Sequence, residues 1–126
     1  MNIMFSNSIT DEVKSKYTLL ELDKFYFSDT QRVDTAFCLV ENIPIQEMFS
    51  VDKMLELHDN LMKNFRERNW KYCEDALEHL TGKWNNELDS FYQVLTERIA
   101  YFKDNDPGDD WSGVIMAATQ PASGDE

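Results

Sequence analysis

The sequence predicts an α+β domain that is mainly helical, in which a small N-terminal β-hairpin packs on three antiparallel helices. Two β-prone stretches, residues 18–27 and 35–43, predict the hairpin. Three apolar stripes within residues 50–104 predict the helices. The chain has 126 residues, of which 42% are hydrophobic, and this is enough for one modest core. We therefore expect a single domain over residues 1–115.

The predicted hairpin extends over residues 18–43, and polar residues 28–34 separate its two strands. The second strand carries apolar residues on both sides, so we expect it to be the more buried one. Upstream, Thr10 and the two acidic residues after it are typical of a helix start. Residues 10–17 then form a short helix before the hairpin, or a longer helix continues through the Leu19 region in place of the first strand. Pro44 predicts a turn or an extended link after the second strand.

Capping residues and apolar stripes define the three helices. Ser50 can cap the first helix, Gly82 suits the C-cap of the second, and Asn85 or Asn86 can cap the third, which ends at residues 104–106. The links are only a few residues long, so neighbouring helices should be antiparallel. The apolar positions recur at offsets of three and four: Val51, Met54, Leu55, His58, Leu61, Met62 and Phe65; then Trp70, Cys73, Ala76, Leu77 and Leu80; then Leu88, Phe91, Tyr92, Leu95, Ile99 and Phe102.

The C-terminal part divides into two segments. Residues 107–115 contain Trp111 in a polar setting. This segment either docks back onto the helices, as the second resemblance described below implies, or anchors a partner. Residues 116–126 have no apolar periodicity and are rich in small and polar residues. They predict a disordered tail.

The link between the first and second helices resembles the turn of a tetratricopeptide (TPR) hairpin. Asn69 stands in the polar turn, Trp70 follows at once, and the small Cys73 comes three positions later, with Leu77 one turn further on. In that family the aromatic residue fills the gap between two closely crossing helices, and the small residue lets their backbones approach. The resemblance implies a TPR-like unit, although the glycine usual in the first helix is absent and residues 84–86 replace the usual proline.

A second resemblance covers about residues 55–118. The segments FRERNW (65–70), ERIAY (97–101) and DWSGV (110–114) occur in that order, with Pro107 before the last. This arrangement is similar to the helical tail that follows the catalytic domain of bacterial class III adenylate cyclases. The part of the chain before it is too short to supply a cyclase domain, so the resemblance implies an accessory module without that activity. The whole chain also resembles small phage proteins, which implies a phage or bacterial origin.

The charge of the chain bears on its partners. There are 24 Asp and Glu residues against 12 Lys and Arg, which gives a net charge of −12. Such a chain repels phosphate backbones, so we expect no direct binding to nucleic acid. The only cysteines, Cys38 and Cys73, lie in apolar segments and predict no disulfide. Residues 1–10 do not resemble a secretory signal and no apolar run could span a bilayer, so we expect a cytoplasmic protein without membrane contact.

One pair of residues resembles part of a catalytic site. His58 and Asp59 form a His-Asp pair like that of metal-dependent phosphohydrolases, but such sites need further histidines, and only His79 remains. His58 also falls on the apolar stripe of its helix, which favours a packed histidine. We therefore expect no enzyme activity, no metal and no cofactor.

The sequence favours a non-catalytic module for protein–protein interaction or self-association. A protein partner is expected, and an exposed helical stripe would favour a homodimer. Trp111, Trp84 and Tyr101 are the candidate partner-binding residues, because aromatic side chains dominate binding energies at interfaces. Two alternatives stay open: an acidic mimic of nucleic acid that blocks a DNA-binding protein, and a metal-dependent phosphohydrolase that uses His58 and Asp59.

Overall fold

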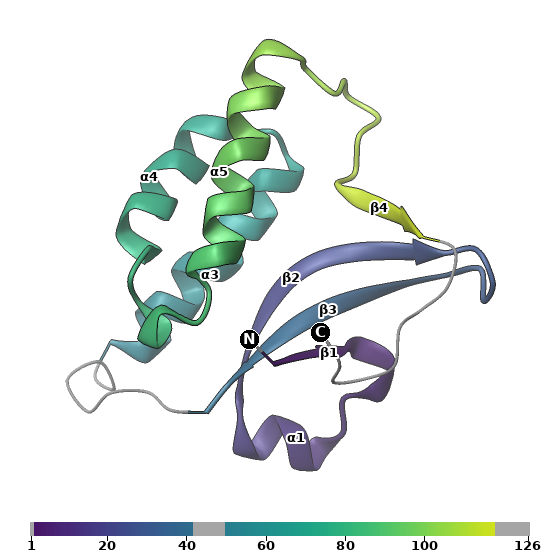
Figure 1. Ribbon diagram of the computed structural model, residues 1–126, viewed down its shortest axis with the longest axis vertical. Helices are drawn as coiled ribbons and strands as arrows, with labels where there is room; N and C mark the ends of the chain where they lie inside the picture. Colours follow the sequence, from purple (N-terminus) through teal and green to yellow (C-terminus); the bar gives the residue numbers. More distant parts are fainter. Residues whose placement is uncertain (1, 42–49, 118–126) are drawn as a thin grey trace. The chain divides into compact units, whose positions relative to one another are not determined.

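The computed structural model describes residues 2–41 and 50–117 (Figure 1). It is a small α+β protein, as the sequence predicts, with helices and a four-stranded mixed sheet. The described residues fall into two compact units. One contains residues 2–41 together with residues 113–117, and the other contains residues 50–112. None of the described helices has both the length and the apolar composition that a membrane span requires.

The first unit is built on a sheet with the strand order β1-β3-β2-β4. Its strands are β1 (Ile3–Phe5), β2 (Thr18–Phe27), β3 (Arg32–Val40) and β4 (Val114–Ala117). β3 runs antiparallel to both β1 and β2, whereas β4 runs parallel to β2. The two strands expected as a small hairpin are therefore the centre of a larger sheet. The packing of such a hairpin on the helices stays a prediction.

The strand boundaries differ from the expected ones. β3 begins at Arg32, within the segment predicted to be a turn, because Tyr26 and Phe27 pair with Val33 and Arg32. Polar residues can lie in a strand where a partner strand satisfies their backbone groups. The expected end of the second strand at Ile43 and the link at Pro44 lie outside the described residues.

A short helix, α1 (Asp11–Lys16), precedes β2. The Thr10 hydroxyl accepts a hydrogen bond from the Val13 backbone N–H at 3.3 Å, as expected for an N-cap. The alternative prediction of a longer helix through Leu19 is wrong, because Leu19 and Leu20 pair with Leu39 and Cys38 in the sheet. The ladder satisfies the backbone groups that a continued helix would have used.

Aromatic rings cover one face of the sheet. Phe5, Phe25 and Phe27 come from β1 and β2, with ring centroids 5.4–6.0 Å apart. A 3-10 turn, Ser6–Ser8, follows β1, and the Ser6 hydroxyl contacts β3 by accepting a hydrogen bond from the Thr35 N–H at 3.1 Å. Leu20 and Cys38, a pair across β2 and β3, are completely buried.

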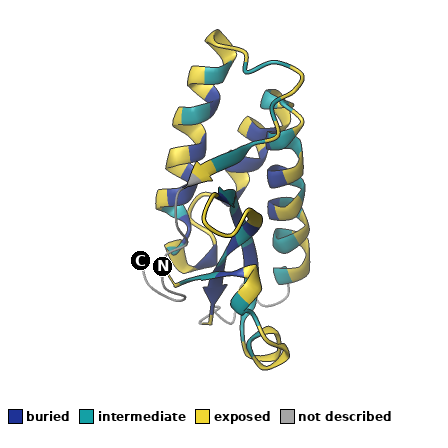
Figure 2. Cartoon of the chain, turned by 90° about the vertical axis from the view of Figure 1, so that its right-hand side faces the viewer, coloured by how far each residue is buried: buried dark blue, intermediate teal, exposed yellow. Residues whose placement is uncertain are grey.

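The second unit consists of α3 (Val51–Arg66), α4 (Trp70–Leu80), a 3-10 turn η2 (Trp84–Asn86) and α5 (Asp89–Asp104). Three residues join α3 to α4, so these two helices run antiparallel (Figure 1). Buried and exposed residues recur in turn along the helices (Figure 2). This is the pattern that the predicted stripes require, and most of their members are buried: His58, Leu61, Met62, Phe65, Cys73, Ala76, Leu77, Leu80, Leu88, Phe91, Tyr92, Leu95 and Ile99.

The start of α5 differs from the prediction. The N-cap position is Leu88, whereas Asn85 and Asn86 lie in η2 with φ angles of 54° and 63°. Asparagine tolerates this left-handed region better than most residues, so the two asparagines serve the turn rather than the cap. Gly82, with φ 87°, lies just past the end of α4. At the other helix start, Ser50 takes the N-cap position without a side-chain capping bond.

The C-terminal segments differ partly from the expectation. Trp111 packs against rings of the helices, as expected for a segment that docks back on them. The disordered tail expected from residue 116 is wrong for its first two residues, because Met116 and Ala117 belong to β4 and pair with Tyr26 and Phe27. Pairing with a distant strand orders a segment that has no periodicity of its own. Residues 118–126 lie outside the described residues.

Candidate functional site

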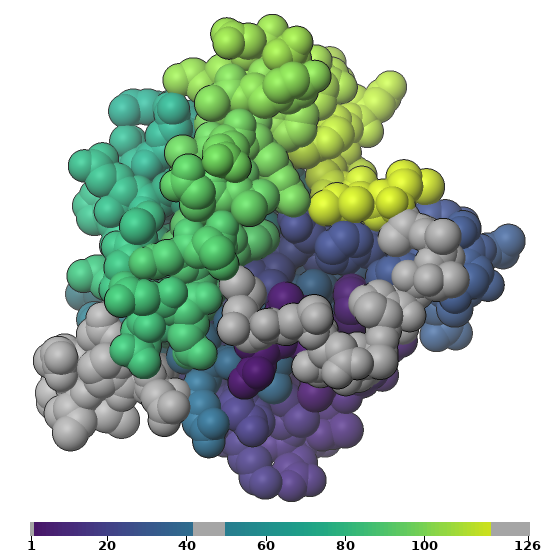
Figure 3. Space-filling view, viewed as in Figure 1, coloured from purple at the N-terminus to yellow at the C-terminus, as the bar shows by residue number. Residues whose placement is uncertain are grey.

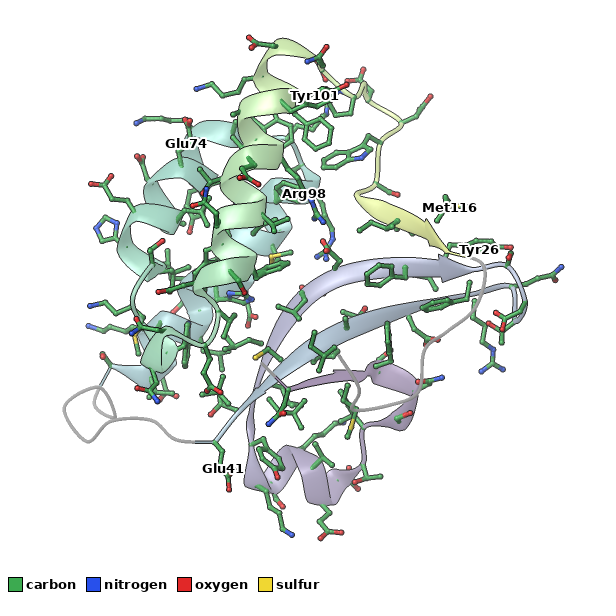
Figure 4. The ribbon with its side chains drawn as sticks, in the orientation of Figure 1. Tyr26, Glu41, Glu74, Arg98, Tyr101 and Met116 are labelled. Carbon is green, nitrogen blue, oxygen red and sulfur yellow. The ribbon has the colours of Figure 1, made fainter. Side chains whose placement is uncertain are left out.

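The three aromatic residues predicted to bind a partner have very different surroundings. Tyr101 is 62% exposed on α5, and Figure 4 shows it near the end of that helix. Trp84 is 0% exposed, so its ring offers no surface to a partner and is removed from the candidates. It lies in the η2 turn, between α4 and α5. Trp111 is half-buried.

Trp111 belongs to an aromatic cluster at one end of the helical unit. Its ring centroid lies 5.3 Å from that of Phe65, 5.9 Å from Trp70 and 5.0 Å from Phe102. Trp70 stacks on Phe102 at 5.6 Å, and Tyr101 contacts Phe102 from the outside at 5.7 Å. Aromatic pairs at such distances are stabilising. The cluster brings together residues of the FRERNW and DWSGV segments and holds the loop after α5 on the helices.

An arginine reinforces this arrangement. Arg68, in the link between α3 and α4, donates hydrogen bonds to the carboxylates of Asp106 and Asp109 in the loop after α5. These bonds, the one to Asp109 first, raise the pKa of the Arg68 guanidinium. The pKa of Asp106 is lowered, mainly because the Gly108 N–H donates to its carboxylate and secondarily because Arg68 does. This cluster of charges is a structural clamp.

The residues of the phosphohydrolase hypothesis do not form a metal site with other described groups. His58 is completely buried, and its Nδ1 lies 2.9 Å from the hydroxyl oxygen of Tyr92, which joins α3 to α5 inside the core. Asp59 is exposed on α3, whereas His79 lies on α4, with its Nδ1 2.9 Å from the Asp75 carbonyl oxygen. Within residues 2–41 and 50–117, no three histidine, cysteine, aspartate or glutamate side chains are close enough to hold a metal ion.

The buried thiol of the helical unit is poorly suited to nucleophilic chemistry. Cys73 has no exposed surface, and its Sγ lies 3.7 Å from the Leu61 carbonyl oxygen. Burial raises the pKa of this thiol to about 12. Since the thiolate is the reactive form, Cys73 acts as a small apolar residue that lets α3 and α4 approach closely.

A concave surface of the helical unit runs between α3 and α4. One hollow of 270 Å³ is lined by Leu57, Tyr72, Asp75, Ala76 and His79. A second hollow, of 520 Å³, is lined by Ser50, Lys53, Met54, Leu57, His79, Leu80 and Lys83. Because they share Leu57 and His79, the two hollows adjoin, and together they are called the α3–α4 groove here. Its lining is mainly apolar, with polar groups at the rim.

Sequence reasoning missed this groove. The signal was present, because Leu57 and Tyr72 are apolar residues that lie off the predicted stripes of their helices. Tyr72 is 37% exposed, and Leu57 is half-buried. An apolar residue beside the core stripe widens the apolar face of a helix beyond what its core needs.

A third hollow, of 340 Å³, lies between α4 and α5, and its lining includes two acidic residues. Leu77, Ile99 and Ala100 contribute to its lining, and Glu74 and Glu78 stand at its rim. Glu74, labelled in Figure 4, accepts a hydrogen bond at 3.1 Å from Lys103 of α5. On the face drawn in Figure 3 the atoms of α4 and α5 adjoin directly. The salt bridge therefore ties one residue of the lining of this hollow to α5.

The sheet unit has an exposed apolar row of its own. Tyr26 of β2 pairs with Val33 on one side and with Met116 on the other, and Figure 4 shows Tyr26 beside Met116. Val33 is 52% and Met116 72% exposed. These three residues form a narrow strip across the sheet. None of them lines one of the hollows described above.

The comparisons with known proteins give no assignment. No protein-family model matches the sequence, and no curated protein and no solved structure is significantly similar to it.

Proposed function

We propose that this protein is a non-catalytic interaction module that binds a partner protein in its α3–α4 groove. The observation that carries the proposal is the mainly apolar lining of the groove, with the exposed ring of Tyr72 on one wall and the half-buried Leu57 shared by both hollows. Grooves between two helices accept the apolar face of a third helix. An aromatic residue such as Tyr72 is the type of side chain that contributes most to such binding.

The proposal includes a TPR-like pairing of α3 and α4. Three features support it: the three-residue link, the edge-to-face contact of Phe65 with Trp70 at 5.7 Å, and the buried Cys73 against the Leu61 carbonyl. They correspond to the turn, the aromatic filler and the small residue of the resemblance stated above. A helix pair of this kind presents its groove on a rigid scaffold, which lowers the entropic cost of binding.

The test compares two substitutions of the same kind in different places. Leu57→Arg puts a charge at the centre of the α3–α4 groove, whereas Val94→Arg changes a 39% exposed residue on α5 that lines none of the hollows described. Immobilised wild-type and variant proteins are exposed to lysate, and bound proteins are identified by mass spectrometry. Each candidate is then purified and its affinity measured by calorimetry.

We expect one partner to bind the wild type and Val94→Arg with similar affinity and to bind Leu57→Arg at least tenfold more weakly, since a buried charge in an apolar contact costs more than about 1.4 kcal/mol. Circular dichroism must show that all three proteins are folded. A partner that binds all three equally would rule out the α3–α4 groove as its site.

A further inference from the structure

One end of the α3–α4 groove is basic, although the chain as a whole is acidic. Its larger hollow, here called the cationic pocket, is lined by Lys53, Lys83 and His79 together with Ser50, Met54, Leu57 and Leu80, and it includes no acidic residue. The chain as a whole has twice as many acidic residues as basic ones. Of the three hollows described in residues 50–112, this one of 520 Å³ is the one whose lining has no acidic residue.

The two lysines come from separate elements. Lys53 lies in the first turn of α3, and Lys83 lies just after α4, before η2. Both are exposed. Three other lysines, Lys16, Lys71 and Lys103, each have a carboxylate within 3.1 Å. Lys53 and Lys83 form no such ion pair with any residue in the described part of the chain.

His79 adds a third polar group to the rim. Its Nδ1 lies 2.9 Å from the Asp75 carbonyl oxygen, which can only accept a hydrogen bond, so Nδ1 carries the hydrogen. This leaves the other ring nitrogen, Nε2, to accept a hydrogen bond in the neutral ring or to donate one in the imidazolium form. The rim of the cationic pocket thus offers two ammonium groups and one adaptable imidazole nitrogen.

The floor of the groove is too long for a small anion alone. From Tyr72 to Leu80 the wall formed by α4 extends about 12 Å at 1.5 Å per residue, or roughly two helical turns. Along this length the lining is mainly apolar, and the basic groups are gathered at one end. The other end includes Asp75, whose carboxylate is paired with Lys71 at 3.1 Å.

We propose that the occupant of the α3–α4 groove is an acidic amphipathic helix of a partner protein. Its apolar face packs on Met54, Leu57 and Tyr72, and carboxylates at one of its ends pair with Lys53 and Lys83. The inference rests on the proposed function and narrows it to one class of partner. Charge complementarity at the rim selects the partner and sets its direction in the groove, whereas the apolar floor supplies most of the affinity.

The experiment uses the full chain and three fluorescein-labelled helical peptides. All three carry leucines at positions i, i+3, i+4 and i+7, and near one end they carry glutamates, glutamines or lysines. Binding is followed by fluorescence anisotropy at low and at high salt. The double variant Lys53→Glu/Lys83→Glu is compared with Lys14→Glu/Lys63→Glu, which changes the net charge equally at exposed lysines that do not line the groove.

We expect the wild type to bind the glutamate peptide roughly tenfold more tightly than the glutamine peptide at low salt, as two surface ion pairs allow. High salt should shrink this difference. The Lys53→Glu/Lys83→Glu variant should lose the preference or reverse it in favour of the lysine peptide. The Lys14→Glu/Lys63→Glu variant should keep it.

Several results would overturn the inference, and they separate it from the proposed function. The wild type could bind the glutamate and glutamine peptides equally well, and Leu57→Arg could abolish binding of both. That result would refute the preference for an acidic helix but would leave the groove as a binding site. Binding that Leu57→Arg does not change would refute the groove itself and with it the proposed function. Sedimentation that shows a dimer lost in Leu57→Arg, with no peptide binding, would identify a second copy as the occupant in place of an acidic helix.

Discussion

Arg68 joins two parts of the helical unit that are distant in sequence, the link between α3 and α4 and the loop after α5. Its φ of 64° places it in the left-handed region, at the turn between α3 and α4. The side chain of Arg68 reaches the loop after α5, where it donates hydrogen bonds to the carboxylates of Asp106 and Asp109. Beside it, Trp111 from the same loop packs on Phe65. One charged clamp and one aromatic contact together hold the loop.

The lowered pKa of Asp106 predicts a pH dependence of stability. A lowered pKa means that the folded state favours the carboxylate, so its contribution is fully present above the ordinary aspartate value of about 3.9 and is lost as the pH falls through the lowered pKa. Urea denaturation measured between neutral and strongly acidic pH should show this loss in the wild type and not in Asp106→Asn. The matched control is Asp104→Asn, at the exposed end of α5. If both variants follow the wild-type curve, the Asp106 contacts do not contribute to stability.

Among the elements, the η2 turn is the most unusual. Trp84, Asn85 and Asn86 have consecutive φ angles of 53°, 54° and 63°, all in the region that L-residues avoid. Trp84 is buried there, and its Nε1 has no hydrogen-bond partner in the described part of the chain. The turn reverses the chain between α4 and α5, and burial of the large indole compensates for this backbone strain.

The turn makes a specific prediction at Asn85, whose side chain is exposed and whose φ and ψ are 54° and 33°. Asn85→Val should destabilise the protein by about 1–2 kcal/mol, because a β-branched residue is strained in this region. Asn85→Gly should change stability by less than about 1 kcal/mol, since glycine has no such strain but gains freedom in the unfolded chain. The measurement is the free energy of unfolding in urea.

Glu87→Val provides the control for this pair, because Glu87 has an ordinary right-handed backbone with φ −68°. It should be tolerated better than Asn85→Val. If Asn85→Val and Glu87→Val prove equally stable, then the left-handed turn is not the conformation that the protein adopts in solution.

At the scale of the whole molecule, the sheet unit is discontinuous in sequence. β4 reaches β2 from the far end of the chain and pairs with residues Lys24–Phe27. The helical residues 50–112 lie between the two parts in sequence, and they form a compact unit with its own core. The edge of the sheet is thus completed by a segment that is separated from the other strands by the entire helical unit.

Truncation tests this arrangement. A chain that ends at Ser112 lacks β4 and leaves the edge of β2 open over Lys24–Phe27, so we expect lower stability, by about 1 kcal/mol for each ladder hydrogen bond lost, and more aggregation. Its far-ultraviolet circular dichroism should keep the helical signal of α3 to α5. A chain that ends at Ala117 retains β4 and is the control. Light scattering that finds the two truncated proteins equally monodisperse, with equal unfolding midpoints, would contradict the role of β4.

Features that depend on neighbouring residues were predictable from the sequence. Helical periodicity and capping are local, because side chains three and four residues apart share a face and a cap contacts its own first turn. The Thr10 cap, the start of α4 at Trp70 and the burial of His58 were therefore accessible without a structure. The same holds for the net charge of −12, which follows from the composition alone.

Features that join distant residues were decided only by the tertiary structure. No local pattern tells that Met116 pairs with Tyr26, that the indole of Trp84 is buried, or that Lys53 and Lys83 share one hollow. For the candidate site, the sequence indicated separate apolar positions: Met54, Ala76 and Leu80 on the stripes and Leu57 and Tyr72 beside them. Strand ladders and shared cavities form between segments that are far apart along the chain. Such a separation leaves no periodic signal in the sequence, so the pairing of strands and the meeting of helix ends are decided by the path of the backbone in three dimensions.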